Sequence, residues 1–262
     1  MVKNSIIFIK QLILPLWVAL TYLFLYIPLF VLAIFSFNNQ MFPYQWVGFT
    51  WKWYQELLIS SEILHATKNS LIVGCMAVVL SLTLSLLFVI WTTRNKHAGL
   101  MAIFYPNLVV PEIILAVGLL SFFIFFNVPF GLVTLIVGHT LLGLGYAIPI
   151  IYQRFQSLDQ RMIEASLSLG ATHRQTFFKI VLPLLTPALV AAGLLVFILS
   201  LDDFLIAFFC AGSTAQTLSL YIFSMIRSGV SPVVNALATV MLLVSSLLVM
   251  IFSSIKTRDI VW

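Results

Sequence analysis

The sequence predicts an all-α membrane protein with six transmembrane helices. The residues A, V, I, L, M, F, W, Y and C make up 62% of the 262 positions, whereas D, E, K and R make up only 8%. A soluble domain carries about 25% charged residues. The mean hydropathy is +1.13, so the chain has more apolar side chains than the core of one soluble domain could bury. The composition therefore excludes a soluble enzyme and a nucleic-acid-binding domain. The basic pI of 9.3 is explained by the Lys and Arg residues that membrane proteins carry in their cytoplasmic loops.

Six apolar runs have the roughly 20 residues that a bilayer-spanning helix needs. The first run follows Lys3 and Lys10 and resembles a signal peptide. It is longer than a signal core and has no small-residue cleavage site, so we expect it to be retained. All six belong to one predicted transmembrane domain over residues 1–262. The predicted spans are 11–35, 69–93, 100–126, 130–153, 186–209 and 233–255.

Basic residues predict the orientation of these spans. With six spans, both termini lie on the same side as the links 94–99 and 154–185. That side holds ten basic residues: Lys3, Lys10, Arg94, Lys96, Arg154, Arg161, Arg174, Lys179, Lys256 and Arg258. The other side holds three: Lys52, Lys68 and Arg227. Because Lys and Arg concentrate in cytoplasmic loops, the termini and the 154–185 segment are predicted to be cytoplasmic.

The 154–185 segment reads as two short helices joined by a sharp bend. Asp159 is a suitable N-cap for the first helix, and Gly170 can take the left-handed conformation that ends it. Thr172 and Gln175 have the spacing of a capping box that starts the second helix. The first helix presents small and apolar groups that suit insertion into a partner's groove, at Met162, Ile163, Ala165, Ser166 and Leu169.

The same segment resembles a motif of the membrane subunits of bacterial ABC importers. Glu164-Ala165-Ser166, three residues, Gly170, nine residues and Ile180-x-Leu182-Pro183 match the loop E-A-A-x3-G-x9-I-x-L-P, with Ser166 in place of the second alanine. The resemblance implies a type I ABC importer permease fold and a helix that docks on a separate ATP-hydrolysing subunit. The implied coupling residues are Glu164, Ala165, Ser166, Gly170 and Ala171.

Further stretches are similar to the PotC-type permeases of spermidine/putrescine importers. They are 35–38, 48–54, 200–204, 218–225 and 229–239. This resemblance implies a non-catalytic permease subunit in a bacterial inner membrane. It also implies a heterodimer with a second permease, an ATPase dimer that binds ATP and Mg inside, and a solute-binding protein outside. The chain itself would bind no cofactor, since it has no G-x-x-x-x-G-K-[ST] loop.

Three acidic residues lie inside the predicted spans without a basic companion: Glu112, Asp202 and Asp203. An ionisable group costs on the order of 2.5 to 3.5 kcal/mol at a helix centre, so it marks a function by default. Glu112 lies about 12 residues from the cytoplasmic end of its span and Asp202 about 16 from its own. At 1.5 Å per residue the two depths differ by roughly 6 Å. The carboxylates therefore predict one path for a cation such as a polyamine. Neighbouring residues on a helix point about 100° apart, and the sequence leaves open whether Asp202 or Asp203 faces the path.

Aromatic residues of the outward link are candidates for cation–π contacts with the solute: Trp46, Trp51, Trp53 and Tyr54. Of these, Trp53 joins the three acidic residues in the predicted substrate path. Aromatic residues at a membrane interface also serve as anchors, and that interpretation stays open.

Other chemistry receives less support. His139 has no ligand at metal-binding spacing, and Cys75 and Cys210 suit small apolar fillers. An intramembrane protease with an Asp202–Asp203 dyad is disfavoured, because adjacent residues on one helix do not converge on one water. The remaining alternative is an importer of the same type for another organic cation, or for a metal carried by a binding protein.

Overall fold

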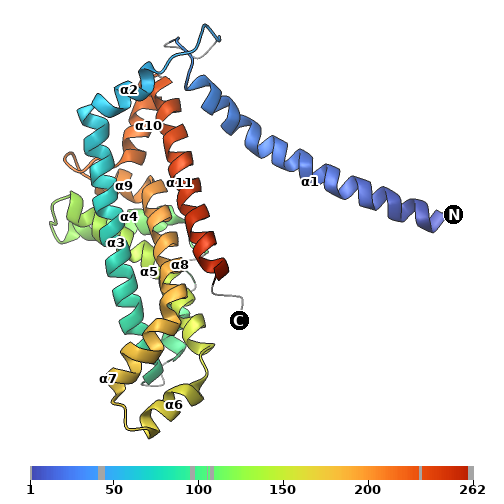
Figure 1. The fold of residues 1–262 in the computed structure, drawn as a ribbon. Helices are drawn as coiled ribbons and strands as arrows, with labels where there is room; N and C mark the ends of the chain where they lie inside the picture. The colour runs from blue at the N-terminus through green and yellow to red at the C-terminus, as the bar shows by residue number, and fades with distance from the viewer. Residues whose placement is uncertain are drawn as a thin grey trace. The chain divides into compact units, whose positions relative to one another are not determined.

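The computed structural model describes residues 2–40, 45–94, 98–104, 106, 109–229 and 232–258. These residues are mainly helical, with one isolated antiparallel bridge between Asn38 and Phe49 (Figure 1). The elements are α1 (Val2–Phe35), α2 (Lys52–Ile59), α3 (Ser61–Arg94), the 3-10 helix η1 (Ala98–Ile103), α4 (Glu112–Phe125), α5 (Leu132–Gln156), α6 (Gln160–Ser168), α7 (His173–Thr176), the π-helical turn η3 (Phe177–Val181), α8 (Leu182–Asp202), α9 (Leu205–Cys210), α10 (Leu218–Ser228) and α11 (Pro232–Arg258).

The described chain divides into two compact units, and the larger one, residues 61–223, is built around α3, α5 and α8. These three helices run side by side, and α4 packs on α9 (Figure 1). Gly143 of α5 permits the close approach. A Cβ added there would lie 2.8 Å from Val196 Cγ1 of α8 and closer still to Ser81 Oγ of α3. Small residues at such crossings let helix backbones pack closely in a membrane.

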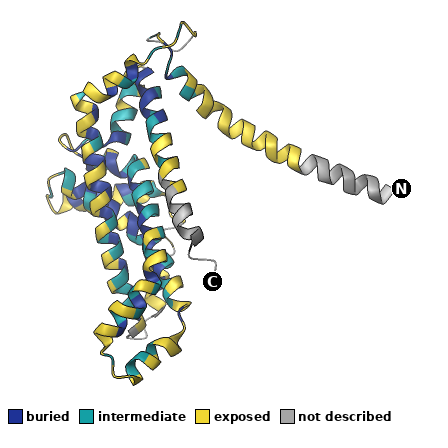
Figure 2. Cartoon of the chain, viewed as in Figure 1, coloured by how far each residue is buried: buried dark blue, intermediate teal, exposed yellow. Residues whose placement is uncertain are grey.

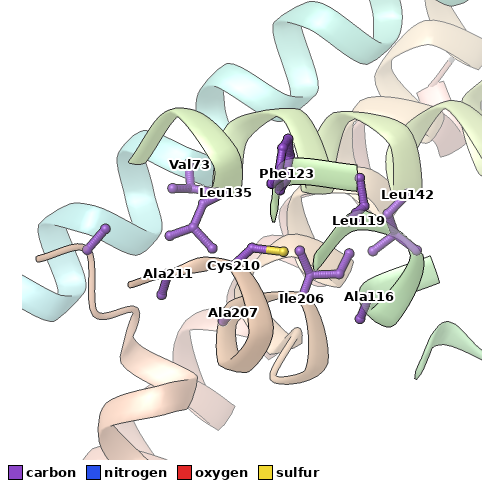
Figure 3. Packing of buried hydrophobic residues seen from close by; sticks show 11 residues of the cluster. Val73, Ala116, Leu119, Phe123, Leu135, Leu142, Ile206, Ala207, Cys210 and Ala211 are labelled. Carbon is purple, nitrogen blue, oxygen red and sulfur yellow. The ribbon is translucent and has the colours of Figure 1, made fainter. Parts of the chain in front are cut away.

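The largest core cluster of this unit lies where α4, α5 and α9 meet (Figure 3). Leu135 and Ile206 are fully buried there, and Phe123 packs beside them. A Cβ on Gly138 would lie 2.6 Å from Ile206 Cγ2, so the absence of a side chain there lets α9 pack closely against α5. The cluster thereby holds the end of α8 and the start of α9 close to α4.

The smaller unit, residues 2–60 with 224–258, contains the ordered part of the link after α1. Asn38 is fully buried in it. Its Nδ2 donates to the carbonyl oxygen of Gln45, and its Oδ1 accepts from the amide of Val47. Trp53 Nε1 donates to the Asn38 carbonyl oxygen at 2.7 Å. The link is therefore a folded structure, and α2 within it packs against α11.

Within the described residues, four helical runs are long and apolar enough to cross a membrane: Pro15–Phe35, Ser61–Thr93, Leu132–Gln156 and His173–Asp202. Glu112–Phe125 and Pro232–Leu247 are shorter apolar helices. None of residues 15–35 is buried (Figure 2), and this run is apolar over its whole length. Such a surface is suited to lipid or to another membrane helix. The basic link residues 95–97 lie outside the described residues.

The predicted span 100–126 is wrong in its first half. Here η1 ends at Ile103, and α4 begins only at Glu112. Pro111 precedes α4 with φ −55° and ψ 131°, and Pro106 lies earlier in the same run. Proline has no amide hydrogen and disfavours helical backbone in the residue before it. Glu112 consequently lies in the first turn of α4 and not deep inside a helix; residues 105, 107 and 108 lie outside the described part.

The predicted span 186–209 is interrupted near its end. It starts within the continuous run from α7 through η3 into α8, which ends at Asp202. Asp203 takes an extended conformation, with φ −61° and ψ 124°, before α9 begins at Leu205. Asp202 and Asp203 are therefore not successive residues of one helix. The break places their side chains in different surroundings.

Candidate functional site

The Asp203 carboxylate lies at the break between α8 and α9 and is only 5% exposed. Its Oδ1 accepts from the amide of Ile206 at 3.2 Å, and its Oδ2 accepts from the amide of Ala207 at 3.0 Å. The Ser219 hydroxyl donates to the Asp203 carbonyl oxygen at 2.5 Å. A short polar residue before a helix satisfies amide groups that have no partner inside the helix. Asp203 therefore stabilises the break itself.

His139 of α5 lies beside this carboxylate. Its Nδ1 is 2.8 Å from Ser200 Oγ, and its Nε2 is 3.4 Å from Asp203 Oδ2. Sequence reasoning missed this contact because 61 residues separate His139 from Ser200. The one available signal was a histidine inside an apolar span, where polar side chains usually find a partner.

The structure brings Glu112 and Asp203 together. Glu112 is the first residue of α4 and Asp203 lies just before α9, and these two helices pack on each other. Glu112 is half-buried, and Asp202 is exposed on the chain's surface. Among the described residues, no Lys or Arg forms an ion pair with these three carboxyls. The site thus has one buried carboxylate that supports the fold and two that are accessible.

Trp53 is not part of this group. It belongs to the smaller unit, where its side chain is 6% exposed and its ring N–H is bonded to Asn38. The Lys52 ammonium lies 5.3 Å from the Trp53 ring centroid. These contacts lie within the smaller unit and give Trp53 a structural role there, and its place in the substrate path stays a prediction. More exposed aromatic rings of the link surround Phe37: Phe49 stacks on it, and Trp51 meets it edge to face.

The 154–185 segment forms the predicted bend. Asp159 caps α6 by accepting from the Arg161 amide, and Thr172 forms a reciprocal capping box with Gln175 at the start of α7. Gly170 has φ +87°, and the Ala171 amide bonds the Ser166 carbonyl oxygen at 3.1 Å. This pattern is a Schellman motif, which ends a helix through a left-handed residue. The local predictions for this segment are confirmed.

The residues of α6 that were predicted to dock on a partner lie on two different sides of the helix. Ile163 packs on a small core with Leu158, Val181 and Leu185 of its own chain. On another side, Ala165 is exposed together with Met162 (48%) and Leu169 (89%). Positions 162, 165 and 169 share one side of a helix, since they are three or four residues apart. Of the five residues predicted to dock on a partner, these three are the exposed ones, whereas Ile163 and Ser166 are half-buried.

Ser166, the departure from the usual alanine, bonds Thr176 Oγ1 at 3.0 Å and so connects α6 to α7. If this segment couples transport to an ATPase, as the resemblance implies, a hydrogen bond worth about 0.5–1.5 kcal/mol net predicts that Ser166→Ala lowers the solute imported per ATP by about two- to tenfold. The measurement is uptake and ATP hydrolysis by the reconstituted complex. Ser168→Ala, on the exposed side of the same helix, is the control. Thr176→Val and the double variant complete a double-mutant cycle. If the effects of Ser166→Ala and Thr176→Val on the solute imported per ATP simply add in the double variant, the hydrogen bond between the two side chains has no such role.

The sequence of this chain is similar to those of known transport proteins. Residues 10–258 match the family described as "Binding-protein-dependent transport system inner membrane component". The chain is 35% identical to the spermidine/putrescine transport system permease protein PotC of Haemophilus influenzae, covering 90% of this chain and 93% of the relative. It is 34% identical to the putrescine transport system permease protein PotI of Escherichia coli, covering 85% and 83%.

Among solved structures, the fold is similar to a chain of a bacterial alginate ABC transporter in complex with an alginate pentasaccharide-bound periplasmic protein. The TM-score is 0.71 at 17% identity, covering 98% of this chain and 97% of the other. This likeness concerns the fold alone. The match across residues 10–258, together with 35% identity over 90% of the chain, shows that this protein belongs to the family of inner membrane components of binding-protein-dependent transport systems.

Proposed function

We propose that this chain is a permease subunit of an ATP-driven importer of polyamines such as spermidine and putrescine. The observation that carries the proposal is the group of carboxyls at the start of α4 and the end of α8, without a basic partner among the described residues. The names of the PotC and PotI relatives support the same solute class.

The accessible carboxylates have the chemistry that a polyamine requires. Its ammonium groups donate several hydrogen bonds each, and hydrogen bonds between ions are about twice as strong as neutral ones. Glu112 is half-buried and Asp202 exposed, so both can meet a solute, whereas Asp203 already accepts two backbone amides. We therefore assign Glu112 and Asp202 to the path and Asp203 to its support.

We assign coupling to the 154–185 segment, which would lie in the cytoplasm with both termini. The exposed stripe of Met162, Ala165 and Leu169 would enter a groove of the ATPase subunit, with the exposed Glu164 beside it. The bend at Gly170 and the Ser166–Thr176 bond would transmit the movement of α6 to α7 and α8. ATP and Mg would be bound by that ATPase, and this chain would remain non-catalytic.

The remaining partners are a second permease and an external solute-binding protein. The apolar surface of α1, none of which is buried between residues 15 and 35, could be covered by another membrane helix. The alginate transporter that shares this fold was solved with a periplasmic protein, which supports a partner of that kind.

Uptake of labelled spermidine and putrescine by the reconstituted complex tests this function. We expect Glu112→Gln and Asp202→Asn each to reduce uptake about tenfold or more, because each removes a charged hydrogen-bond acceptor from the path. Assembly of the complex should be unchanged. Glu56→Gln, an exposed carboxylate of α2, is the control and should transport normally.

Two results would contradict the proposal. If both amide variants transport like the Glu56→Gln control, the carboxylates do not form the path. If the complex hydrolyses ATP but imports neither polyamine, the solute is a different one. Competition by other organic cations and by divalent metals in the same assay then identifies the alternative class.

A further inference from the structure

His139 is a buried polar side chain to which the proposed path assigns no role. Its residue is 1% exposed, and its Nε2 atom makes no hydrogen bond among the described residues. A buried polar atom without a partner costs free energy, and few are found in folded proteins. The retention of a histidine at this point in an apolar helix therefore requires a physical reason.

The position of the ring supplies one. The His139 ring contacts one residue near the end of α8 and one residue just after it. Its Nδ1 is 2.8 Å from Ser200 Oγ, and its Nε2 is 3.4 Å from Asp203 Oδ2. The same Oδ2 accepts the Ala207 amide at 3.0 Å. The ring therefore lies against the carboxylate while that carboxylate caps α9. In this position the Asp203 carboxylate is held between the His139 ring and the first turn of α9.

The consequence extends to the two accessible carboxyls. Asp202 is the last residue of α8 and directly precedes Asp203, so its direction depends on where the helix stops. Glu112 is the first residue of α4, which packs on α9 next to Asp203. Both residues therefore have positions that depend on how Asp203 is held.

We propose that His139 is a positioning residue that holds the Asp203 carboxylate against α9 and thereby sets how Asp202 and Glu112 face the transported cation. This inference rests on the proposed function for the part that concerns transport. It assigns the decisive contact to Nε2 and not to Nδ1. The bond from Nδ1 to Ser200 fixes the ring, and the Nε2 edge limits the movement of Asp203.

Two amide substitutions separate the two ring nitrogens. The amide of glutamine reaches about as far as Nε2 of histidine, and the amide of asparagine about as far as Nδ1. His139→Gln therefore keeps a polar group facing Asp203, whereas His139→Asn keeps only the contact with Ser200. Thr140→Val is the matched control, because Thr140 is a buried polar neighbour on α5 whose hydroxyl donates to the Ile136 carbonyl oxygen of its own helix.

The experiment uses the whole complex in proteoliposomes with labelled spermidine. We expect His139→Asn to raise the KM for uptake about tenfold with a smaller change in kcat. His139→Gln should stay within about threefold of the unsubstituted complex, and Thr140→Val should not differ from it. In parallel, hydrogen–deuterium exchange should be faster over residues 203–211 in His139→Asn than in His139→Gln.

The exchange measurement keeps this inference separate from the proposed function. Equal exchange in the two variants would overturn the positioning role, whatever the uptake. Faster exchange in His139→Asn without a change in KM would also overturn it, provided that Glu112→Gln and Asp202→Asn reduce uptake. If those two variants transport normally as well, it is the cation path itself that has failed, and with it the transport part of this inference.

Discussion

Replacing Gly170 with valine is expected to uncouple solute uptake from ATP hydrolysis while leaving the protein inserted in the membrane. Gly170 has φ +87°, in the left-handed region, which costs an L-residue roughly 1–2 kcal/mol and is especially unfavourable for a β-branched side chain. No atom lies within 4 Å of a Cβ built there, so the penalty comes from the backbone and not from crowding. We expect uptake to fall at least about tenfold, because the bend between α6 and α7 would open. The measurement is uptake together with ATP hydrolysis stimulated by the loaded binding protein.

Asparagine at the same position distinguishes conformation from side-chain volume. Asn tolerates the left-handed region far better than valine, so Gly170→Asn should keep most of the uptake. Gly118→Val on α4 is a control for adding a side chain to an uncrowded glycine with no positive φ. Full uptake by Gly170→Val would contradict the assignment of this bend to coupling.

Replacing Asp203 with alanine is expected to destabilise the folded chain more than any change at Asp202. The substitution leaves the amides of Ile206 and Ala207 without their acceptors, each in a buried position. An unpaired buried donor costs about 1–3 kcal/mol. We expect a lower melting temperature of the solubilised complex and a smaller yield of assembled complex, measured by thermal denaturation and size-exclusion chromatography.

Asparagine again provides the informative comparison. The side-chain oxygen of Asn can still cap α9, so Asp203→Asn should retain most of the stability. Asp202→Ala, at an exposed residue, should leave the melting temperature unchanged. If Asp203→Ala is as stable as Asp202→Ala, the break between α8 and α9 does not depend on this carboxylate.

Local signals in the sequence were sufficient for the 154–185 segment. The caps at Asp159 and Thr172 and the left-handed Gly170 involve partners within five residues, and each forms as expected. Such contacts depend on backbone geometry that the neighbouring residues alone determine. The rest of the segment was less predictable. Whether Ile163 faces its own chain depends on Val181 and Leu185, which follow after the bend.

The boundaries of the membrane spans were predicted less accurately than this segment. Hydropathy averaged over about 20 residues locates an apolar run but does not reveal a break within it. It passed over Pro106 and Pro111 before α4 and over Asp203 at the end of α8. Each of these breaks does have a local signal, because proline interrupts a helix and an aspartate caps one.

Composition and contacts between near neighbours were enough to identify a helical membrane protein, to locate its apolar runs and to predict a bend flanked by caps. They could not show that Asp203 supports the fold while Asp202 is exposed, or that His139 lies against both Ser200 and Asp203. The physical reason is that a carboxylate's role depends on which groups surround it, and here those groups come from α4, α5, α8 and α9, brought together only by packing.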